Sequence, residues 1–239
     1  MNHTAAPTAT TANPLYRQVR VLQPARHSQR SLKPAGHYGF AAQAQVVPLL
    51  AVEMALAARE LPIVFGGGSQ PYPLAVLGLA QGQNLCVDDD GQWQAGDYVP
   101  SHLRRYPFIF LEDPARRELT LCIDEAATVA QDEGAGATQA LFLQSGQPSA
   151  LTRSALAYCR DYQAHHLLTQ RLCQALADAD LLVDQRASVT LRNGQRLALD
   201  GFRVIEQARF QQLSTDTLQA WQAQGWLAPI HAHLQSVRN

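Results

Sequence analysis

The pattern of hydrophobic and polar positions along the chain predicts a series of short strands. Alternating or briefly apolar runs that stop at Pro, Gly or Asp are typical of strands with a buried face. Such runs occupy residues 16–23, 44–47, 63–65, 72–79, 84–88, 107–112 and 118–125. Asp113-Pro114 lies between the last two runs, so we expect them to pair as a hairpin.

A second hairpin is expected in the last quarter of the chain. Residues 182–207 contain two alternating runs on either side of Asn193-Gly194. This dipeptide favours the left-handed backbone angles of a tight hairpin turn. Residues 126–140 are instead small and polar, which predicts a loop.

Helical patterns occur singly between these strands. Residues 149–179 contain neither Gly nor Pro and predict the longest helix. Shorter helices are expected at 49–60, where Leu61-Pro62 ends the helix, at 101–106 as one turn, from Ser214 to Gly225, and from Pro229 onward. Single helices combined with hairpin strands predict an α+β fold: a mostly antiparallel mixed sheet with one long helix and several short helices.

The N-terminal residues differ in composition from the rest of the chain. Residues 1–14 are rich in Ala, Thr and Pro, so we expect a flexible N-terminal segment over 1–30 and a single α+β domain over 31–239. This start has neither the basic residues nor the apolar stretch of a secretory signal. No window reaches the roughly 18–20 apolar residues of a membrane span. The sequence therefore predicts a cytoplasmic protein without a membrane span.

Composition narrows the possible partners. Hydrophobic residues make up 46% and charged residues 16% of the chain, which is typical of a globular protein. The formal net charge is -1, and Arg104-Arg105 and Arg116-Arg117 are the only basic doublets. A nucleic-acid-binding protein normally carries a basic face, so we expect no nucleic-acid partner. The cysteines form no CxxC pair and are expected to be buried free thiols: Cys86, Cys122, Cys159 and Cys173.

Several stretches of unusual sequence are spaced along the chain from about residue 37 to its end. They include VPLLAVEMALAARELPIVF at 47–65, then QNLCVD, GQW and YVPSHLRRYPFIF within 77–110, LCIDE at 121–125, and FRVIEQARFQQLS and GWLAPIHAHLQSVRN in the last part. Together they resemble the SapC family of bacterial proteins, which is named for its association with surface-layer proteins. Similar chains resemble proteins encoded near flavin-dependent halogenase-like enzymes and outer-membrane nutrient receptors. The resemblance implies a role in a surface, uptake or enzyme-partner pathway and assigns no reaction.

Glu53 is the first candidate for chemistry. In the expected helix it lies among Leu49, Val52 and Leu56, on the side that faces the core. A buried carboxylate requires a partner or a proton. We expect a structural ion pair with Arg104 or Arg105, and the alternative is a general base or a metal ligand.

Residues 92–107 form the second candidate, as mostly irregular chain between two strands. Exposed aromatic and Arg side chains dominate binding energy at many interfaces, and Arg suits carboxylate and phosphate groups. We therefore expect a recognition surface for a protein partner or an anionic small ligand, formed by Trp93, Tyr98, His102, Arg104 and Arg105. The same segment could instead bury Trp93 and Tyr106 in the core.

Three further patterns favour structural explanations. Gly66-Gly67-Gly68 follows a strand but lacks the spacing of a phosphate loop. His165-His166 and His231-Ala232-His233 lie in expected helices, where neither spacing lets both rings bind one ion easily. We expect no metal site and no cofactor.

Two classes of function remain open. The sequence lacks a GxSxG elbow, paired catalytic carboxylates and a Cys–His signature, which favours a non-catalytic binding or accessory protein over an enzyme. The alternative is an enzyme of unfamiliar class that acts on a small molecule or peptide through Glu53, His102 and Arg104 or Arg105. A third hypothesis, an exported structural protein, would require a dedicated secretion route. The sequence leaves the ligand and the oligomeric state open.

Overall fold

The computed structural model describes residues 15–33, 36–68, 70–94, 96, 98–113, 118–131, 139–190, 194 and 196–237. The chain forms two compact units, each assembled from two separate stretches. The first unit combines residues 1–40 with 105–160, and the second combines 41–104 with 161–239. Helix α4 (Ala150–Asp178) contributes its first residues to the first unit and the remainder to the second.

The first unit contains two small antiparallel sheets. One has the strand order β1-β7-β6, from β1 (Val19–Val21), β7 (Glu118–Asp124) and β6 (Phe108–Asp113). The other has the order β8-β2-β9, from β8 (Thr128–Ala130), β2 (Arg30–Leu32) and β9 (Gln139–Ala140). Two short helices connect strands of these sheets, α1 (Pro24–His27) between β1 and β2 and η3 (Glu125–Ala127) between β7 and β8. A third, η1 (Gly39–Ala41), follows β2 and ends in the second unit.

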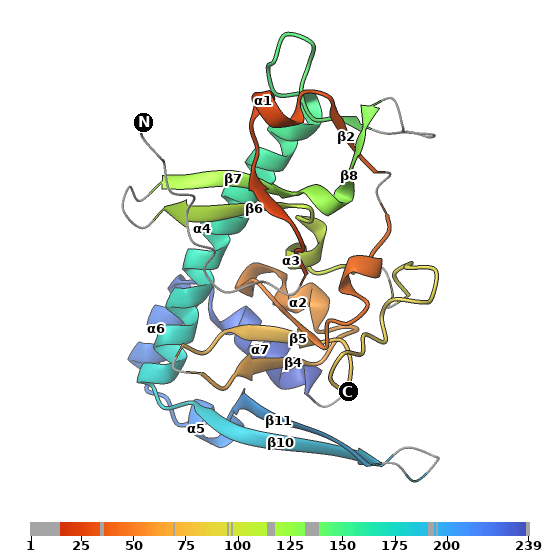
Figure 1. Ribbon diagram of the computed structural model, residues 1–239. Coiled ribbons are helices and arrows are strands. Elements are labelled where there is room, and N and C mark those ends of the chain that lie inside the picture. The colour runs from red at the N-terminus through yellow and green to blue at the C-terminus, as the bar shows by residue number, and fades with distance from the viewer. Residues whose placement is uncertain are drawn as a thin grey trace, which may run out of the picture. The chain divides into compact units, whose positions relative to one another are not determined.

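The hairpin of β6 and β7 carries much of the first unit's core. The two strands pair in continuous register from Phe108↔Ile123 to Asp113↔Glu118, as the alternating pattern predicts, and lie side by side in Figure 1. Phe108 and Ile123 pack with Leu141, Phe142 and Cys159 in one hydrophobic cluster. Burying these side chains supplies the main favourable free energy for this unit.

The second unit is built on one five-stranded sheet with the order β10-β11-β4-β5-β3. Its strands are β10 (Leu182–Thr190), β11 (Arg196–Ile205), β4 (Ile63–Gly66), β5 (Pro73–Val76) and β3 (Val46–Pro48), and all neighbours pair antiparallel. Its helices are η2 (Ala51–Glu53), α2 (Met54–Ala57), α3 (Ser101–Arg104), α5 (Gln207–Gln211), α6 (Thr215–Ala223) and α7 (Leu227–Ser236). Helix α7 packs against β4, β11 and α2.

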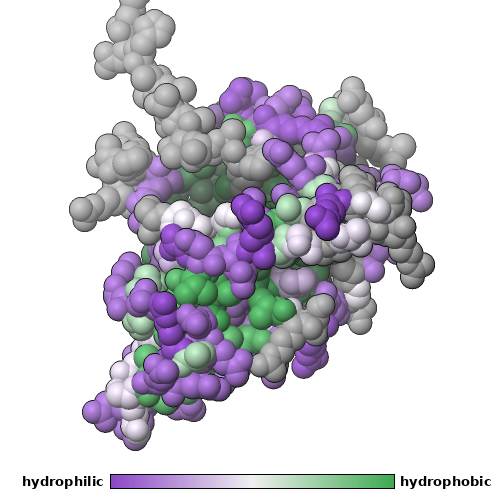
Figure 2. Space-filling view, turned by 90° about the horizontal axis from the view of Figure 1, so that it is seen from below, coloured by the Kyte–Doolittle hydropathy of each residue, from purple (hydrophilic) through white to green (hydrophobic). Residues whose placement is uncertain are grey.

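Hydrophobic side chains also line the sheet face formed by Val64, Val76 and Phe202. These three are buried, and Leu74, Leu199 and Val204 pack against them while remaining partly exposed. Figure 2 shows a hydrophobic region on the surface seen from below, with hydrophilic residues around it.

Most of the expected elements are present, and the α+β class is confirmed. The long helix at 149–179 is α4, and the alternating runs around Asn193-Gly194 form the β10–β11 hairpin. Asn193 lies outside the described residues. Ser214 caps α6 as expected, because its side chain accepts a hydrogen bond from the N–H of Thr217. The strands form three antiparallel sheets rather than one.

Three expectations differ from the structure. The helix expected at 49–60 is shorter, with η2 followed by α2, because Glu53 folds back onto the backbone before it. The strand expected at 84–88 is absent apart from a bridge between Val87 and Trp93, since Asn84 bonds the N–H of Cys86 and competes with a ladder. The loop expected at 126–140 contains β8 and β9, which pair with the distant β2.

The segment expected to be flexible, residues 1–30, is described only in part by the structure. Residues 1–14 lie outside the described part of the chain. Residues 15–30, assigned from sequence to the same flexible segment, contain β1 and α1, and β1 pairs with β7. β1 lies within the alternating run at 16–23 that predicts a strand, whereas its distant partner β7 cannot be identified from that local pattern.

The described residues agree with two further expectations. All four cysteines are free and buried, and burial raises the pKa of Cys159 to about 11 and that of Cys173 to about 12. Among the described helices, none combines the length and hydropathy needed to cross a bilayer.

His233 joins α7 to two strands of the second unit. The fully buried ring accepts a hydrogen bond from the N–H of Ile205 at Nε2 (3.0 Å) and donates from Nδ1 to the carbonyl of Ile63 (2.9 Å). Since Nε2 must accept, the ring is neutral with its proton on Nδ1. Burial lowers the pKa of His233 to about 4, although the bond to Ile63 opposes this shift.

This arrangement predicts a stability loss in mild acid. Unfolded histidine binds a proton below a pKa of about 6.5, whereas folded His233 does so only near its lowered pKa of about 4. The stability from His233 is therefore complete above about pH 6.5 and is lost as the pH falls towards 4, by about 2 kcal/mol between about pH 7 and pH 5. Urea unfolding at both pH values measures this loss.

The H-x-H sequence supplies a matched control. His231 is exposed and makes an edge contact with Phe210. We expect the free energy of unfolding of His231→Gln to depend on pH as that of the parent does. His233→Gln should lose most of the decrease between about pH 7 and pH 5. Equal pH dependence in the two variants would contradict the role of His233.

Candidate functional site

The carboxyl group of Glu53 lies at the centre of the candidate site, in the second unit. Its side chain is only 5% exposed. Oε1 accepts a hydrogen bond from the N–H of Leu50 (2.7 Å), and Oε2 accepts from the N–H of Ser101 (2.9 Å) and from the hydroxyl of Tyr98. Three donors from two distant stretches of the chain therefore satisfy one buried acceptor.

The local sequence explains why Glu53 turns inward. β3 ends at Pro48, and η2 begins three residues later with Glu53 as its last residue. A Glu at this position can reach back to the N–H that precedes the first turn, as Glu53 does to Leu50. The neighbouring N–H of Ala51 donates to the hydroxyl of Thr169 on α4 (2.9 Å). Two of the orphan N–H groups at this helix start are thus satisfied by side chains.

The expected ion pair between Glu53 and an arginine is wrong for the described residues. Backbone N–H groups and a phenol take the place of Arg104 or Arg105, and Arg105 belongs to the first unit. Arg104 bonds nearby backbone and hydroxyl groups instead: Nε donates to the carbonyl of Val99 (2.9 Å) and Nη2 to Ser101 Oγ (2.8 Å). A periodic pattern identifies the buried acid but cannot show which donors reach it.

Tyr98 lies between Glu53 and Arg104. Its hydroxyl bonds the Glu53 carboxylate, and the Arg104 guanidinium carbon lies 5.9 Å from the centre of its ring. Burial raises the pKa of Tyr98, and the negative charge and hydrogen bond of Glu53 raise it further, while Arg104 opposes the shift. The phenol is therefore held protonated, as a donor to Glu53.

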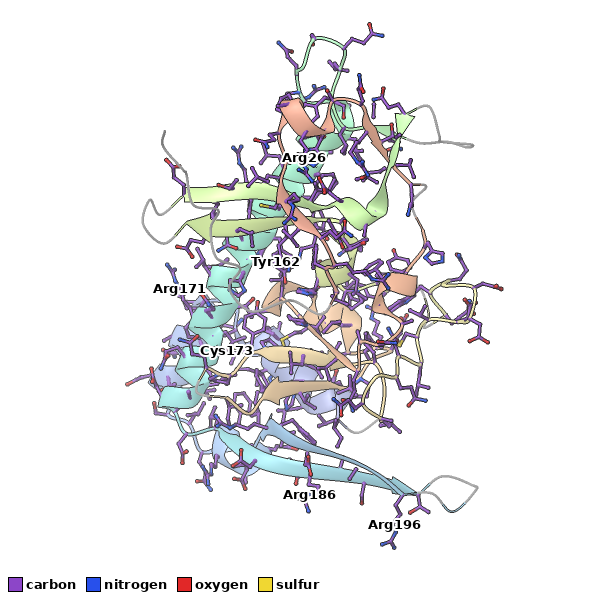
Figure 3. All side chains as sticks on the ribbon, viewed as in Figure 1. Arg26, Tyr162, Arg171, Cys173, Arg186 and Arg196 are labelled. Atoms are coloured by element: carbon purple, nitrogen blue, oxygen red, sulfur yellow. The ribbon has the colours of Figure 1, made fainter. Side chains whose placement is uncertain are left out.

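His102, the next predicted site residue, is buried against α4. It is 6% exposed, and its Nδ1 lies 3.1 Å from the hydroxyl of Tyr162, which Figure 3 labels midway along α4. This placement leaves little of the ring to meet a partner. Its expected part in recognition stays a prediction.

The remaining predicted recognition residues are more accessible. Arg104 is exposed, while Trp93 and Tyr98 are partly exposed. Trp93 is bridged to Val87, and Arg105 lies in the other unit. The second unit thus brings Tyr98 and Arg104 together at the surface end of the Glu53 network.

A second polar network, which sequence reasoning missed, involves Tyr72. Its hydroxyl lies 2.8 Å from Nδ1 of His166 on α4, and burial is the largest cause of a raised Tyr72 pKa. His166 is therefore a satisfied histidine, as the sequence suggested. Tyr72 follows Pro71 in an irregular stretch, and nothing in that local pattern indicates a partner on α4.

The other patterns with possible chemistry have structural explanations. A Cβ on Gly67 would lie 2.5 Å from the carbonyl oxygen of Gly201, so this glycine allows two backbones to approach closely. His231 and His233 diverge, one to the surface and the other into the core. The described part of the chain contains no group of three His, Cys, Asp or Glu side chains that could hold a metal ion.

Asp124 is the corresponding buried acid of the first unit, and it was missed from sequence. It is fully buried and accepts hydrogen bonds from the N–H groups of Arg17 (2.9 Å), Gln18 (2.8 Å) and Ala126 (3.1 Å). The Tyr106 hydroxyl adds a fourth bond at 3.2 Å. The signal available in the sequence was the first of the two acids at the end of LCIDE, directly after the apolar residues Leu121, Cys122 and Ile123.

Removal of the Glu53 acceptor should be costly. Glu53→Ala strands two N–H groups and a phenol, so we expect a loss of about 3–5 kcal/mol in the free energy of unfolding. Tyr98→Phe removes one donor and should cost about 1 kcal/mol. Denaturant unfolding measures both values.

Glu112 is the control for the Glu53 measurement. It is an exposed glutamate on β6 of the first unit. We expect Glu112→Ala to change the free energy of unfolding by less than about 1 kcal/mol. A Glu53→Ala variant as stable as Glu112→Ala would show that the buried network contributes no stability.

Comparison with known proteins identifies the family of this chain. No curated protein and no solved structure matches the chain. The model of the family described as SapC matches residues 22–239, which is nearly the whole chain and includes Glu53, Tyr98 and Arg104. The chain belongs to the SapC family.

Proposed function

We propose that this protein is a non-catalytic binding or accessory protein. The observation that carries the proposal is the saturation of Glu53, the one buried carboxylate in the candidate site, by three donors of the chain itself. A general base must lie within hydrogen-bond reach of the proton that it removes. Glu53 directs its oxygens at Leu50, Tyr98 and Ser101 instead.

The hydrogen bonds around Glu53 support a role for this carboxylate in positioning the exposed Arg104 side chain. Glu53 fixes the Tyr98 hydroxyl and the backbone of Ser101, and Ser101 in turn accepts a hydrogen bond from Arg104. With a second bond to Val99, the Arg104 side chain is held in one orientation. An arginine that is ordered before binding loses less entropy when it grips an anion.

The residues next to Glu53 in sequence favour a protein as the partner. Val52 is 63% exposed and Leu56 is 49% exposed, one helical turn apart in η2 and α2. Exposed apolar side chains, arginine and tyrosine all occur at protein interfaces, and here these residues belong to one unit. We therefore propose a protein partner that presents a carboxylate or another anionic group to Arg104, with an anionic small ligand as the alternative occupant.

The wider context of the proposal is the family. Membership in the SapC family is consistent with an accessory role in a surface, uptake or enzyme-partner pathway. We further propose that the protein acts in the cytoplasm. The alternative of an enzyme that uses Glu53, His102 and Arg104 or Arg105 is weakened because Glu53 is occupied and His102 is buried against Tyr162.

A native purification tests the role of Arg104. A tagged copy is purified from cells that naturally make the protein, and copurifying proteins are quantified by mass spectrometry relative to the tagged chain. Arg104→Glu should lower the recovery of the partner about tenfold or more, because it reverses the charge of a central contact. Arg104→Glu also removes the hydrogen bonds to Val99 and Ser101, so we expect the free energy of unfolding to fall by about 1–2 kcal/mol. Recovery of the partner is therefore compared at a temperature at which thermal unfolding shows both proteins to be folded.

Arg171→Glu is the matched control. Arg171 is also exposed and lies in the same unit, on α4. The proposal expects this variant to retain the partner at the parent's level. If both variants retain the protein partner equally, Arg104 does not belong to the interface. If Arg104→Glu loses only a bound anionic small molecule, the surface binds the alternative ligand.

A further inference from the structure

Strand β10 forms an open edge of the sheet in the second unit. The strand order β10-β11-β4-β5-β3 places it at one end, and among the described residues it pairs with β11 on one side only. It has nine residues, whereas β3 at the opposite edge has three. Residues 184–188 are all exposed, and Figure 3 shows Arg186 projecting outward from this hairpin. Long exposed edge strands offer unpaired backbone groups to another strand.

Two hydrogen bonds identify which backbone groups point away from β11. The N–H of Glu206 donates to the carbonyl of Leu181 (2.9 Å), which makes these two residues a hydrogen-bonded pair. Pairing continues through Leu182↔Ile205 to Gln185↔Phe202, so alternation directs the backbone groups of 182 and 184 outward. The register then shifts between Gln185 and Ala187, where two steps along β10 face three steps along β11. The extra residue therefore lies on β11, and the alternation of β10 itself continues to Arg186. The N–H of Arg186 donates to the side chain of its neighbour Gln185 (3.2 Å), which agrees with this direction.

The charges on this edge select one kind of partner. Asp184 and Arg186 are two positions apart, so they share a face and point along the same edge. When two copies of β10 lie antiparallel about a two-fold axis at Gln185, Asp184 of each copy faces Arg186 of the other. An axis at Asp184 or at Arg186 instead places like charges opposite each other, which is destabilising.

The same register also satisfies the backbone. Asp184 and Arg186 both direct their N–H and C=O groups outward, so facing residues form a hydrogen-bonded pair across the axis. If the axis lay midway between two residues, a residue whose backbone groups point outward would face one whose groups point towards β11. The two strands could then form no ladder of hydrogen bonds. Backbone direction and side-chain charge therefore favour the same register.

The ion pairs within each hairpin would extend across this junction. Asp184 bonds Arg203 on β11 (3.2 Å), and Arg186 lies 3.4 Å from Asp200. The Asp184 and Arg186 side chains are still 89% and 74% exposed, respectively. Antiparallel pairing would form a row of four side chains whose charges alternate in sign. The first copy contributes Arg203 and Asp184, and the second copy continues the row with Arg186 and Asp200. Networks of this kind contribute more than isolated surface pairs.

We propose that β10 is a self-association surface, at which two copies of this chain pair antiparallel about Gln185 and join their five-stranded sheets into one. This junction is independent of Arg104 and of the proposed accessory function. The contact is narrow, so we expect a weak dimer with a dissociation constant on the order of 1–100 µM. Salt should weaken it, since exposed charges are screened.

Charge reversal tests the register. Sedimentation equilibrium over a range of protein concentrations measures self-association of the full chain. Asp184→Arg alone and Arg186→Asp alone should each weaken dimerisation about tenfold or more, because each places like charges opposite. The double variant Asp184→Arg with Arg186→Asp restores opposite charges across the axis and should dimerise more strongly than either single variant. It should stay weaker than the parent, because it places like charges opposite Arg203 and Asp200 within each hairpin. Arg171→Asp, at an exposed site on α4, is the control and should have no effect.

A disulfide test keeps the proposal falsifiable if dimerisation is weak. The axis brings Gln185 of both copies together as a non-hydrogen-bonded pair, about 4.5 Å between Cα atoms, which is within disulfide range. Under mild oxidation, Gln185→Cys should form a disulfide-linked dimer and Thr215→Cys, at an exposed site on α6, should not. A strictly monomeric parent without Gln185→Cys cross-linking would overturn the proposal, as would a dimer that the single charge reversals leave unchanged.

Discussion

The buried carboxylate of Glu53 is the contact on which the arrangement of the candidate site depends. It joins the start of η2 to the Tyr98–Ser101 stretch, which is separated from it by more than forty positions of sequence. Without this acceptor, two N–H groups and a phenol would be buried or half-buried with no partner, at about 1–3 kcal/mol each. The position of Arg104 follows from it, because that side chain bonds the same short helix that Glu53 holds.

The first unit uses the same physical solution at another place. Asp124 ends β7 and accepts hydrogen bonds from three backbone N–H groups and from Tyr106, as Glu53 does from two N–H groups and Tyr98. In each unit, one buried acid ties an irregular chain segment to a regular element and a tyrosine completes its shell. Acids of this kind help specify where a segment without a strong local pattern must lie, since buried donors are costly unless they reach an acceptor.

The sequence predicted the elements with strong local patterns and missed those that depend on distant partners. The hairpins β6–β7 and β10–β11, the long helix α4 and the cap at Ser214 all follow from periodicity and turn residues. The pairing of β8 and β9 with β2, and the irregular path at 84–88, depend on contacts across the chain. Glu53 was identified from sequence as a candidate because an acid stands among apolar residues, but its donors come from positions that periodicity cannot connect.

The central claim is that Glu53 remains permanently occupied by its own chain and is not available to a substrate. Native-state hydrogen exchange of the Leu50 and Ser101 amides tests this claim directly, since both donate to Glu53. We expect both amides to exchange only through global unfolding, with the same dependence on denaturant as amides in the core of the sheet. Fast exchange of both amides through a local opening, at a free energy far below that of global unfolding, would show that Glu53 is released in the native state and would contradict the account.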